Sequence, residues 1–163
     1  MAIKELELLK VAILNEVEGE TFYRLAAEHL GQGEIRTLLL YLADEEAKHQ
    51  ETLRKLYKDL AAGKEALSED LKLDHTPSTG IFDLMKLGKV KSNLEISVVS
   101  TGISMEKASM DYYNQAAEQS EQKAVKDLCQ YLSRWEREHM EKLEKIYDYL
   151  KTEWFEAQGF STS

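Results

Sequence analysis

The sequence predicts an all-α fold, a four-helix bundle made of two duplicated helical hairpins joined by a long crossover. Long runs of Leu, Glu, Lys and Ala recur at helical spacing, with one proline and almost no strand pattern in 163 residues. The second half also repeats the first, because adding 90 to any position from Glu16 to Leu60 gives its counterpart without a gap. A connection of roughly 30 residues separates the halves, which is long enough to run the length of a helix.

The first hairpin is expected at about 3–62. Its first helix spans about 3–30 and ends at Gly31 and Gly33, since glycine readily ends a helix, and its second helix spans about 34–62.

The crossover, 63–91, contains Pro77, several glycines and polar clusters, with a short helix expected at IFDLMKL (81–87). The second hairpin is expected at about 92–154. Its first helix begins near Ser92, where SNLE resembles a capping box, and ends near Glu121, and its second helix covers about 122–154. Residues 1–163 are therefore predicted to form a single domain.

Composition excludes several classes of function. The net charge of -9 would repel nucleic acid and anionic lipid, so neither is an expected partner. No apolar run of 18 residues and no signal-peptide pattern is present, which predicts a cytoplasmic protein. The single cysteine, Cys129, cannot form an intramolecular disulfide or a CxxC metal motif and is expected to be a small core residue.

Six polar residues fall on helical faces that are otherwise apolar. At about 100° per residue, Glu16 lies within about 20° of Leu9 and Tyr23. Other inward-phased acids and histidines occupy corresponding positions in both halves. The residues predicted to converge in the core are Glu16, Glu46, His49, Glu106, Glu136 and His139.

Repetition alone does not select these six residues. Four other repeated acids are predicted to face solvent, namely Glu28, Glu118, Glu51 and Glu141. Glu45 and Glu20 rank below the six because their counterparts are Trp135 and Met110. His29 is expected to interact with the helix dipole, and His75 is expected in a loop.

Carboxylates crowded into a bundle core repel one another unless they are protonated or neutralised, and two divalent cations would balance four of them. Each ExxH motif, at Glu46 and Glu136, places an oxygen and a nitrogen ligand on adjacent turns of one face. The pattern predicts a dinuclear site for iron or manganese, with zinc as an unreactive substitute. Tyr23 and Tyr113 are expected to be core aromatics whose hydroxyls also orient the carboxylates.

The motifs EVEGETFYRLAAE, EEAKH, ISMEKASMDYYNQAAE and EREH resemble the rubrerythrin branch of the ferritin-like superfamily, from about Lys4 to Leu150. The resemblance implies a carboxylate-bridged centre of two iron ions, with Glu46 and Glu136 bridging and Glu16 and Glu106 as outer ligands. It also implies hydrogen peroxide or dioxygen as the oxidant.

The sequence departs from typical rubrerythrins in two ways. Those proteins carry another glutamate three residues after the third-helix ligand, where this chain has Ser109, which puts an iron shift in doubt. They also end in a rubredoxin domain with paired CxxC motifs, which one cysteine cannot build. Electrons are therefore expected from a separate donor protein such as a rubredoxin, and without such a donor turnover is expected to be slow.

The leading hypothesis is a di-iron peroxidase. The alternatives are an iron-binding ferroxidase or metal-handling protein without peroxidase turnover, and a structural or partner-binding bundle whose site no longer reacts. A homodimer is expected, with the duplicated hairpins paired within one chain or exchanged between two chains.

Overall fold

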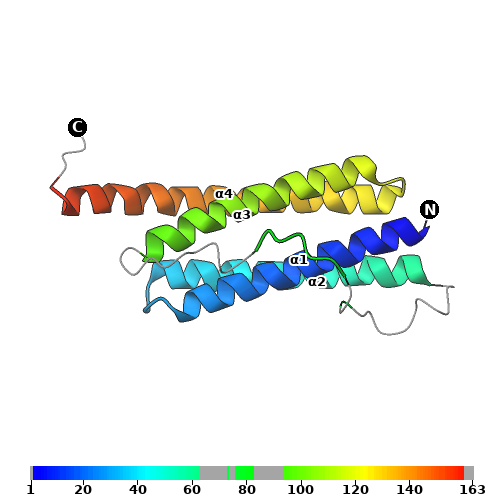
Figure 1. The fold of residues 1–163 in the computed structure, drawn as a ribbon, viewed down its shortest axis with the longest axis horizontal. Helices are drawn as coiled ribbons and strands as arrows, with labels where there is room; N and C mark the ends of the chain where they lie inside the picture. The colour runs from blue at the N-terminus through cyan, green and yellow to red at the C-terminus, as the bar shows by residue number, and fades with distance from the viewer. Residues whose placement is uncertain (1, 63–72, 74–75, 83–93, 160–163) are drawn as a thin grey trace.

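The computed structural model describes residues 2–62, 73, 76–82 and 94–159, and these form helices and connections without any strand. Figure 1 shows two helical hairpins lying side by side, so the predicted all-α bundle is confirmed. No helix within the described ranges is both long and apolar enough to cross a membrane. The helices are α1 (Ala2–Glu28), α2 (Glu34–Ala61), α3 (Leu94–Gln119) and α4 (Lys123–Ala157).

The C-terminal ends of three helices differ by two or more residues from the predicted bounds, and that of α3 lies at Gln119 instead of near Glu121. α1 ends at Glu28 because the amides of His29 and Leu30 bond to carbonyls three residues back, at 3.2 and 3.3 Å, which tightens the last turn. α4 continues to Ala157 instead of ending at Trp154. The predicted capping box at Ser92, most of the predicted short helix at 81–87 and His75 lie outside the described residues.

Helices pack closely within each hairpin, α1 against α2 and α3 against α4, whereas the backbones of the two hairpins approach each other much less. Side chains fill the space between hairpins as two apolar clusters. One contains Phe22, Leu39 and Leu143, and the other contains Leu9 and Leu132. The first cluster includes residues from the C-terminal halves of α1 and α4, and the second includes residues from their N-terminal halves. Buried polar side chains occupy the middle of the bundle, between the two clusters.

Part of the crossover, residues 76–82, forms a strap on α1, and Figure 1 shows it passing over the middle of the bundle. Thr79 Oγ1 donates a hydrogen bond to Asn15 Oδ1 at 2.7 Å, and Asn15 Nδ2 donates to Ser109 Oγ of α3 at 3.0 Å. Asn15 and Ser109 are both fully buried. The strap is therefore connected to both hairpins through a polar contact in the core.

Phe82 anchors the end of the strap. Its buried ring lies 6.3 Å from the ring of Phe22 and 6.1 Å from that of Tyr23, measured between centroids. A Cβ atom on Gly19 would lie 3.2 Å from the Phe82 ring, so a glycine at this position of α1 lets the ring approach the helix closely. The strap thus adds an aromatic wall beside Tyr23.

Glu5 ties the start of the chain to the turn between α3 and α4. Its carboxylate is 2% exposed and accepts hydrogen bonds from Ser120 Oγ at 2.9 Å and from the amides of Glu121 at 2.8 Å and Gln122 at 3.3 Å. These amides stand just before α4, where no helical carbonyl is available to accept them. An acid of the first hairpin thereby caps the second.

Replacing Glu5 by alanine is expected to lower the free energy of unfolding by about 1–3 kcal/mol, because the buried donors lose a charged acceptor. Urea denaturation of metal-free protein measures this change. Glu7→Ala is the matched control, since Glu7 is exposed and pairs with the nearby Lys10 on the helix surface, and its effect should stay within about 0.5 kcal/mol. Equal effects for the two variants would show that the Glu5 cap does not stabilise the fold.

Candidate metal centre

The six residues predicted to converge do meet in the middle of the bundle, between the two apolar clusters. The phase of each helix turns them inward together with neighbouring leucines. All six are buried, and none is more than 5% exposed. α1 supplies Glu16, α2 supplies Glu46 and His49, α3 supplies Glu106, and α4 supplies Glu136 and His139.

These side chains form two overlapping groups in which the potential ligand atoms lie within 4.8 Å of one another. Glu46 and Glu136 belong to both groups. Each group combines residues of both hairpins, so neither hairpin alone completes a site. The groups are Glu16, Glu46, His49 and Glu136, and Glu46, Glu106, Glu136 and His139.

In the first group, the imidazole of His49 faces three carboxylates. Its Nδ1 lies 3.3 Å from Glu16 Oε2, 3.3 Å from Glu46 Oε2 and 3.4 Å from Glu136 Oε1. One nitrogen and three oxygens therefore surround a common centre.

In the second group, His139 Nδ1 lies 3.4 Å from Glu46 Oε1, 3.5 Å from Glu106 Oε1 and 3.7 Å from Glu136 Oε2. The imidazoles of His49 and His139 stack with centroids 5.6 Å apart and planes 17° from parallel. The two halves of the site thus have the same donor set in similar arrangements, as the internal repeat predicts.

The donor set can be tested against the metal pair that the chemistry implies. Several buried polar atoms have no hydrogen-bond partner among the described residues, and each such group costs about 1–3 kcal/mol if it stays unsatisfied. Cations bound between the carboxylates would satisfy them, so the residues fit a pair of divalent ions. The atoms are Glu46 Oε1, Glu106 Oε2, both carboxylate oxygens of Glu136 and both ring nitrogens of His139.

Burial and mutual repulsion determine how the outer carboxyls ionise without an ion. Burial and the negative charges of Glu46 and Glu136 raise the pKa of Glu16 well above its ordinary value. Burial and the charge of Glu136 do the same to the pKa of Glu106. The protonated form of both outer carboxyls is therefore favoured when no cation is present.

The shared carboxyls behave in the opposite way. Burial raises the pKa of Glu46, but interactions with the Glu16 carboxyl and both imidazoles outweigh burial and leave the pKa lowered. For Glu136, burial and repulsion by Glu46 are outweighed by interactions with Glu106 and the imidazoles, so its pKa is also lowered.

The two imidazoles complete this charge balance. Burial lowers the pKa of His49 and His139, yet the surrounding carboxylates outweigh burial and hold both pKa values well above the ordinary range. Without ions, these opposite shifts favour protonated imidazoles and outer carboxyls beside ionised shared carboxyls. Cations that bind here compete with those protons.

Two buried tyrosines support the outer carboxyls across the hairpin boundary. Tyr23 of α1 donates a hydrogen bond to Glu106 of α3, and Tyr113 of α3 donates to Glu16 of α1. Burial and the nearby carboxylates raise the pKa of both phenols, so both hydroxyls stay protonated. Each hydroxyl is thus in contact with a carboxyl that it could orient. The orienting role itself stays a prediction from the sequence. The sequence did not predict that each tyrosine bonds to a carboxyl of the other hairpin.

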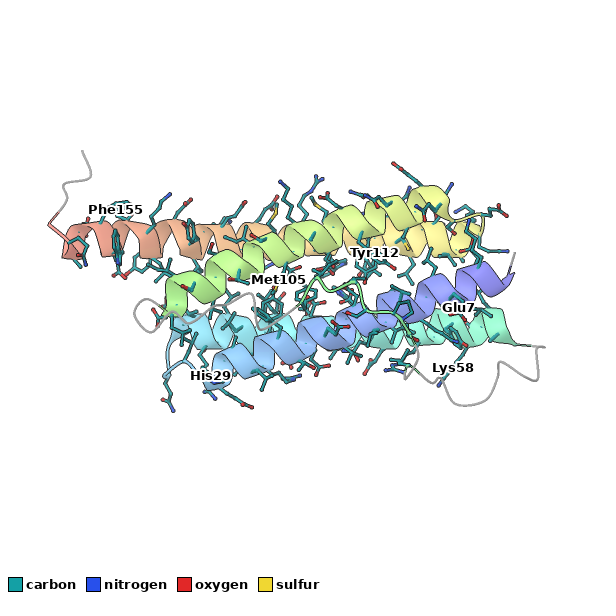
Figure 2. All side chains as sticks on the ribbon, in the orientation of Figure 1. Glu7, His29, Lys58, Met105, Tyr112 and Phe155 are labelled. Atoms are coloured by element: carbon teal, nitrogen blue, oxygen red, sulfur yellow. The ribbon has the colours of Figure 1, made fainter. Side chains whose placement is uncertain are left out.

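The residues ranked below the six lie outside the two groups. Glu45 is buried but pairs with Lys48 at 2.7 Å, and Glu20 pairs with Arg24 at 2.9 Å. Figure 2 shows His29 near the end of α1, where its ring nitrogen lies 2.7 Å from the Leu25 carbonyl oxygen. The repeated acids predicted to face solvent are exposed, namely Glu28, Glu118, Glu51 and Glu141.

Cys129 is fully buried in the apolar cluster that contains Leu9 and Leu132, as predicted for a small core residue. Burial raises the pKa of its thiol to about 12, so the thiol is neutral and not poised to bind metal.

Sequence reasoning missed one neighbour of the site, Trp135 of α4. Its ring centroid lies 6.0 Å from that of His49 and 6.5 Å from that of His139. The available signal was the break in the repeat, since the counterpart of Trp135 is Glu45.

A four-helix bundle of two hairpins, with four carboxylates and two imidazoles gathered in its core, defines a protein of the ferritin-like carboxylate class. The family model for rubrerythrin matches residues 7–147. The chain therefore belongs to the rubrerythrin family, and this membership and the buried cluster fit a di-iron protein. Its single cysteine leaves no paired CxxC motifs for a rubredoxin domain within these 163 residues.

Comparison with solved structures gives a similar overall fold. The chain is similar to the structure titled "Hypothetical Protein Pfu-1136390-001 From Pyrococcus furiosus", with a TM-score of 0.66 and 26% sequence identity. The similarity covers 91% of this chain and 90% of that chain. Comparison with curated proteins gives no match.

Proposed function

We propose that this protein is a di-iron oxidoreductase that reduces hydrogen peroxide with electrons from a separate donor. The observation that carries the proposal is the pair of overlapping ligand groups that share Glu46 and Glu136. Two shared carboxylates would hold two ions next to each other, where both can reach one small oxidant. Reduction of one peroxide consumes two electrons and two protons and yields two water molecules.

In this proposal Glu16 and His49 complete one site, and Glu106 and His139 complete the other. Carboxylate oxygens with neutral imidazole nitrogens suit iron or manganese. When bound, a pair of redox-active ions would supply the two electrons that peroxide reduction requires.

The remaining residues around the site position its ligands and exclude water. Tyr23 and Tyr113 hold one oxygen of each outer carboxyl, which limits the rotation of these side chains. The apolar clusters at either end of the site keep water out of the bundle core. These contacts favour controlled access by a small oxidant over exposure to solvent.

The electron donor is proposed to be a separate one-electron carrier such as a rubredoxin. The chain has a single cysteine, which is buried, and cannot itself build a Cys-ligated iron site.

The test compares two oxidants. Protein loaded anaerobically with ferrous iron is mixed with hydrogen peroxide or with air-saturated buffer, and the absorbance of the oxidised centre is followed by stopped flow. Oxidation by peroxide is expected to be faster by at least about tenfold, a difference of about 1.4 kcal/mol in the activation free energy. The variant with Glu51→Gln and Glu141→Gln is the control, since it changes two repeated acids that face solvent. Equal or slower oxidation by peroxide would remove the peroxidase proposal and favour a ferroxidase or metal-handling role.

A further inference from the structure

Trp135 contacts both halves of the candidate metal centre. Its partly exposed ring meets the imidazoles of His49 and His139 edge-on, at interplanar angles of 67° and 65°. Because the two imidazoles belong to different ligand groups, one indole lies beside both sites.

Tyr131 extends this aromatic contact to solvent. It lies one helical turn before Trp135 on α4, its ring centroid is 5.8 Å from that of Trp135, and it is 42% exposed. Tyr131 and Trp135 therefore form a continuous series of ring contacts from the surface to the imidazoles, here named the α4 aromatic path.

Two other aromatic series reach the site, and each reaches one outer ligand only. Tyr112, labelled on α3 in Figure 2, lies 5.3 Å from Tyr113, which bonds to Glu16. Phe82 of the strap lies beside Tyr23, which bonds to Glu106. Among the ring contacts of the described residues, apart from the stacking of His49 on His139 itself, only those of Trp135 join ligands of both groups.

The α4 aromatic path has no equivalent in the other half of the internal repeat. The counterpart of Tyr131 is Tyr41, which is similarly exposed at 39%. The counterpart of Trp135 is Glu45, so no indole follows Tyr41 toward the imidazoles. The ring of Tyr41 instead lies beneath Lys142 Nζ, at 5.8 Å. Two equally exposed tyrosines thus differ in their connection to the site.

We propose that the α4 aromatic path is the electron entry route, by which a one-electron donor at the surface of α4 reaches the metal pair. The inference rests on the proposed di-iron function. Electron tunnelling through protein weakens steeply with distance, and closely spaced π systems couple better than aliphatic packing. Each encounter oxidises the donor by one electron. Two encounters and two protons convert one peroxide to two water molecules, and the rings end each transfer unchanged.

The test follows electron entry without peroxide. Each variant is loaded with iron, its metal content is measured, and the oxidised protein is mixed anaerobically with the methyl viologen radical cation, whose own colour loss reports the transfer. Trp135→Leu and Tyr131→Leu are expected to slow the transfer severalfold, and Trp135→Phe should restore much of the rate because it returns a ring. Tyr41→Leu and Trp154→Leu are the matched controls and should react like the wild type.

A purely structural role for Trp135 gives a different result. It would lower the metal content of Trp135→Leu while Tyr131→Leu, which changes a ring in contact with Trp135, kept the wild-type rate. That result, or wild-type rates in both variants at full metal content, would overturn the entry route. Failure of the proposed function is distinguishable, since peroxide would then show no advantage over air even though viologen electrons still entered through Trp135.

A second readout needs no electron transfer from outside. In Trp154→Phe protein, Trp135 is the only remaining indole, and titration with Co²⁺ should quench its emission as the ligand groups fill. Emission that stays unchanged while cobalt binds would contradict close electronic contact between Trp135 and the site.

Discussion

Replacing Glu46 and Glu136 together by glutamine is expected to reduce bound metal from about two ions per chain to nearly none. Both residues belong to both ligand groups, so the double variant removes two anionic carboxylates from each group. Changing only an outer hydrogen-bond partner of a ligand typically weakens metal binding by about 10–100-fold, and direct ligands contribute more. Elemental analysis of protein from iron-supplemented cells measures the loss.

The matched control is the double variant Glu51→Gln and Glu141→Gln, which alters equivalent repeat positions on exposed faces. It carries the same change in net charge and should retain the metal of the wild type. Circular dichroism of all variants separates loss of ligands from loss of helix. Unchanged metal content in the Glu46 and Glu136 variant would place the ions elsewhere and remove the proposed centre.

Metal binding is expected to release close to four protons per chain at neutral pH, about one each from Glu16, Glu106, His49 and His139. The pKa of each of these groups is raised, which favours its protonated form when no ion is bound, and that proton competes with the cation. Affinity should therefore increase as pH rises, by about tenfold per pH unit for every proton displaced.

Calorimetric titration with Mn²⁺ in buffers of different ionisation enthalpy measures the number of protons released. Repeating the titration at several pH values from mildly acidic to neutral measures the slope of affinity. The variant with Glu46→Gln and Glu136→Gln should show neither the affinity nor the release. A pH-independent affinity would mean that the imidazoles and outer carboxyls are already deprotonated in the metal-free protein.

Helical periodicity was enough to predict the composition of the buried cluster. Each polar residue shared the helical phase of neighbouring leucines. The 90-residue repeat then excluded acids such as Glu45 from the predicted ligands, because its counterpart is not an acid. The arrangement is physical in origin, because a helix that buries its leucines must also bury Glu46 and His49 at the same phase.

Contacts between distant segments could not be predicted in the same way. The pairing of Tyr23 with Glu106 depends on how the hairpins face each other, which periodicity within one helix does not encode. The cap that Glu5 provides joins residues 115 or more positions apart and follows no local motif. The contact of Trp135 with both imidazoles likewise depends on the relative rotation of α2 and α4.

Because the bundle consists of two hairpins, a bound metal ion would affect the stability of the contact between them. The helices pack closely within each hairpin, while both ligand groups take side chains from the two hairpins. A bound ion would therefore act as a reversible cross-link, closing a loop between Glu16 and Glu136 much as a disulfide does. Loss of metal would then weaken the interface between the two hairpins before either hairpin unfolded.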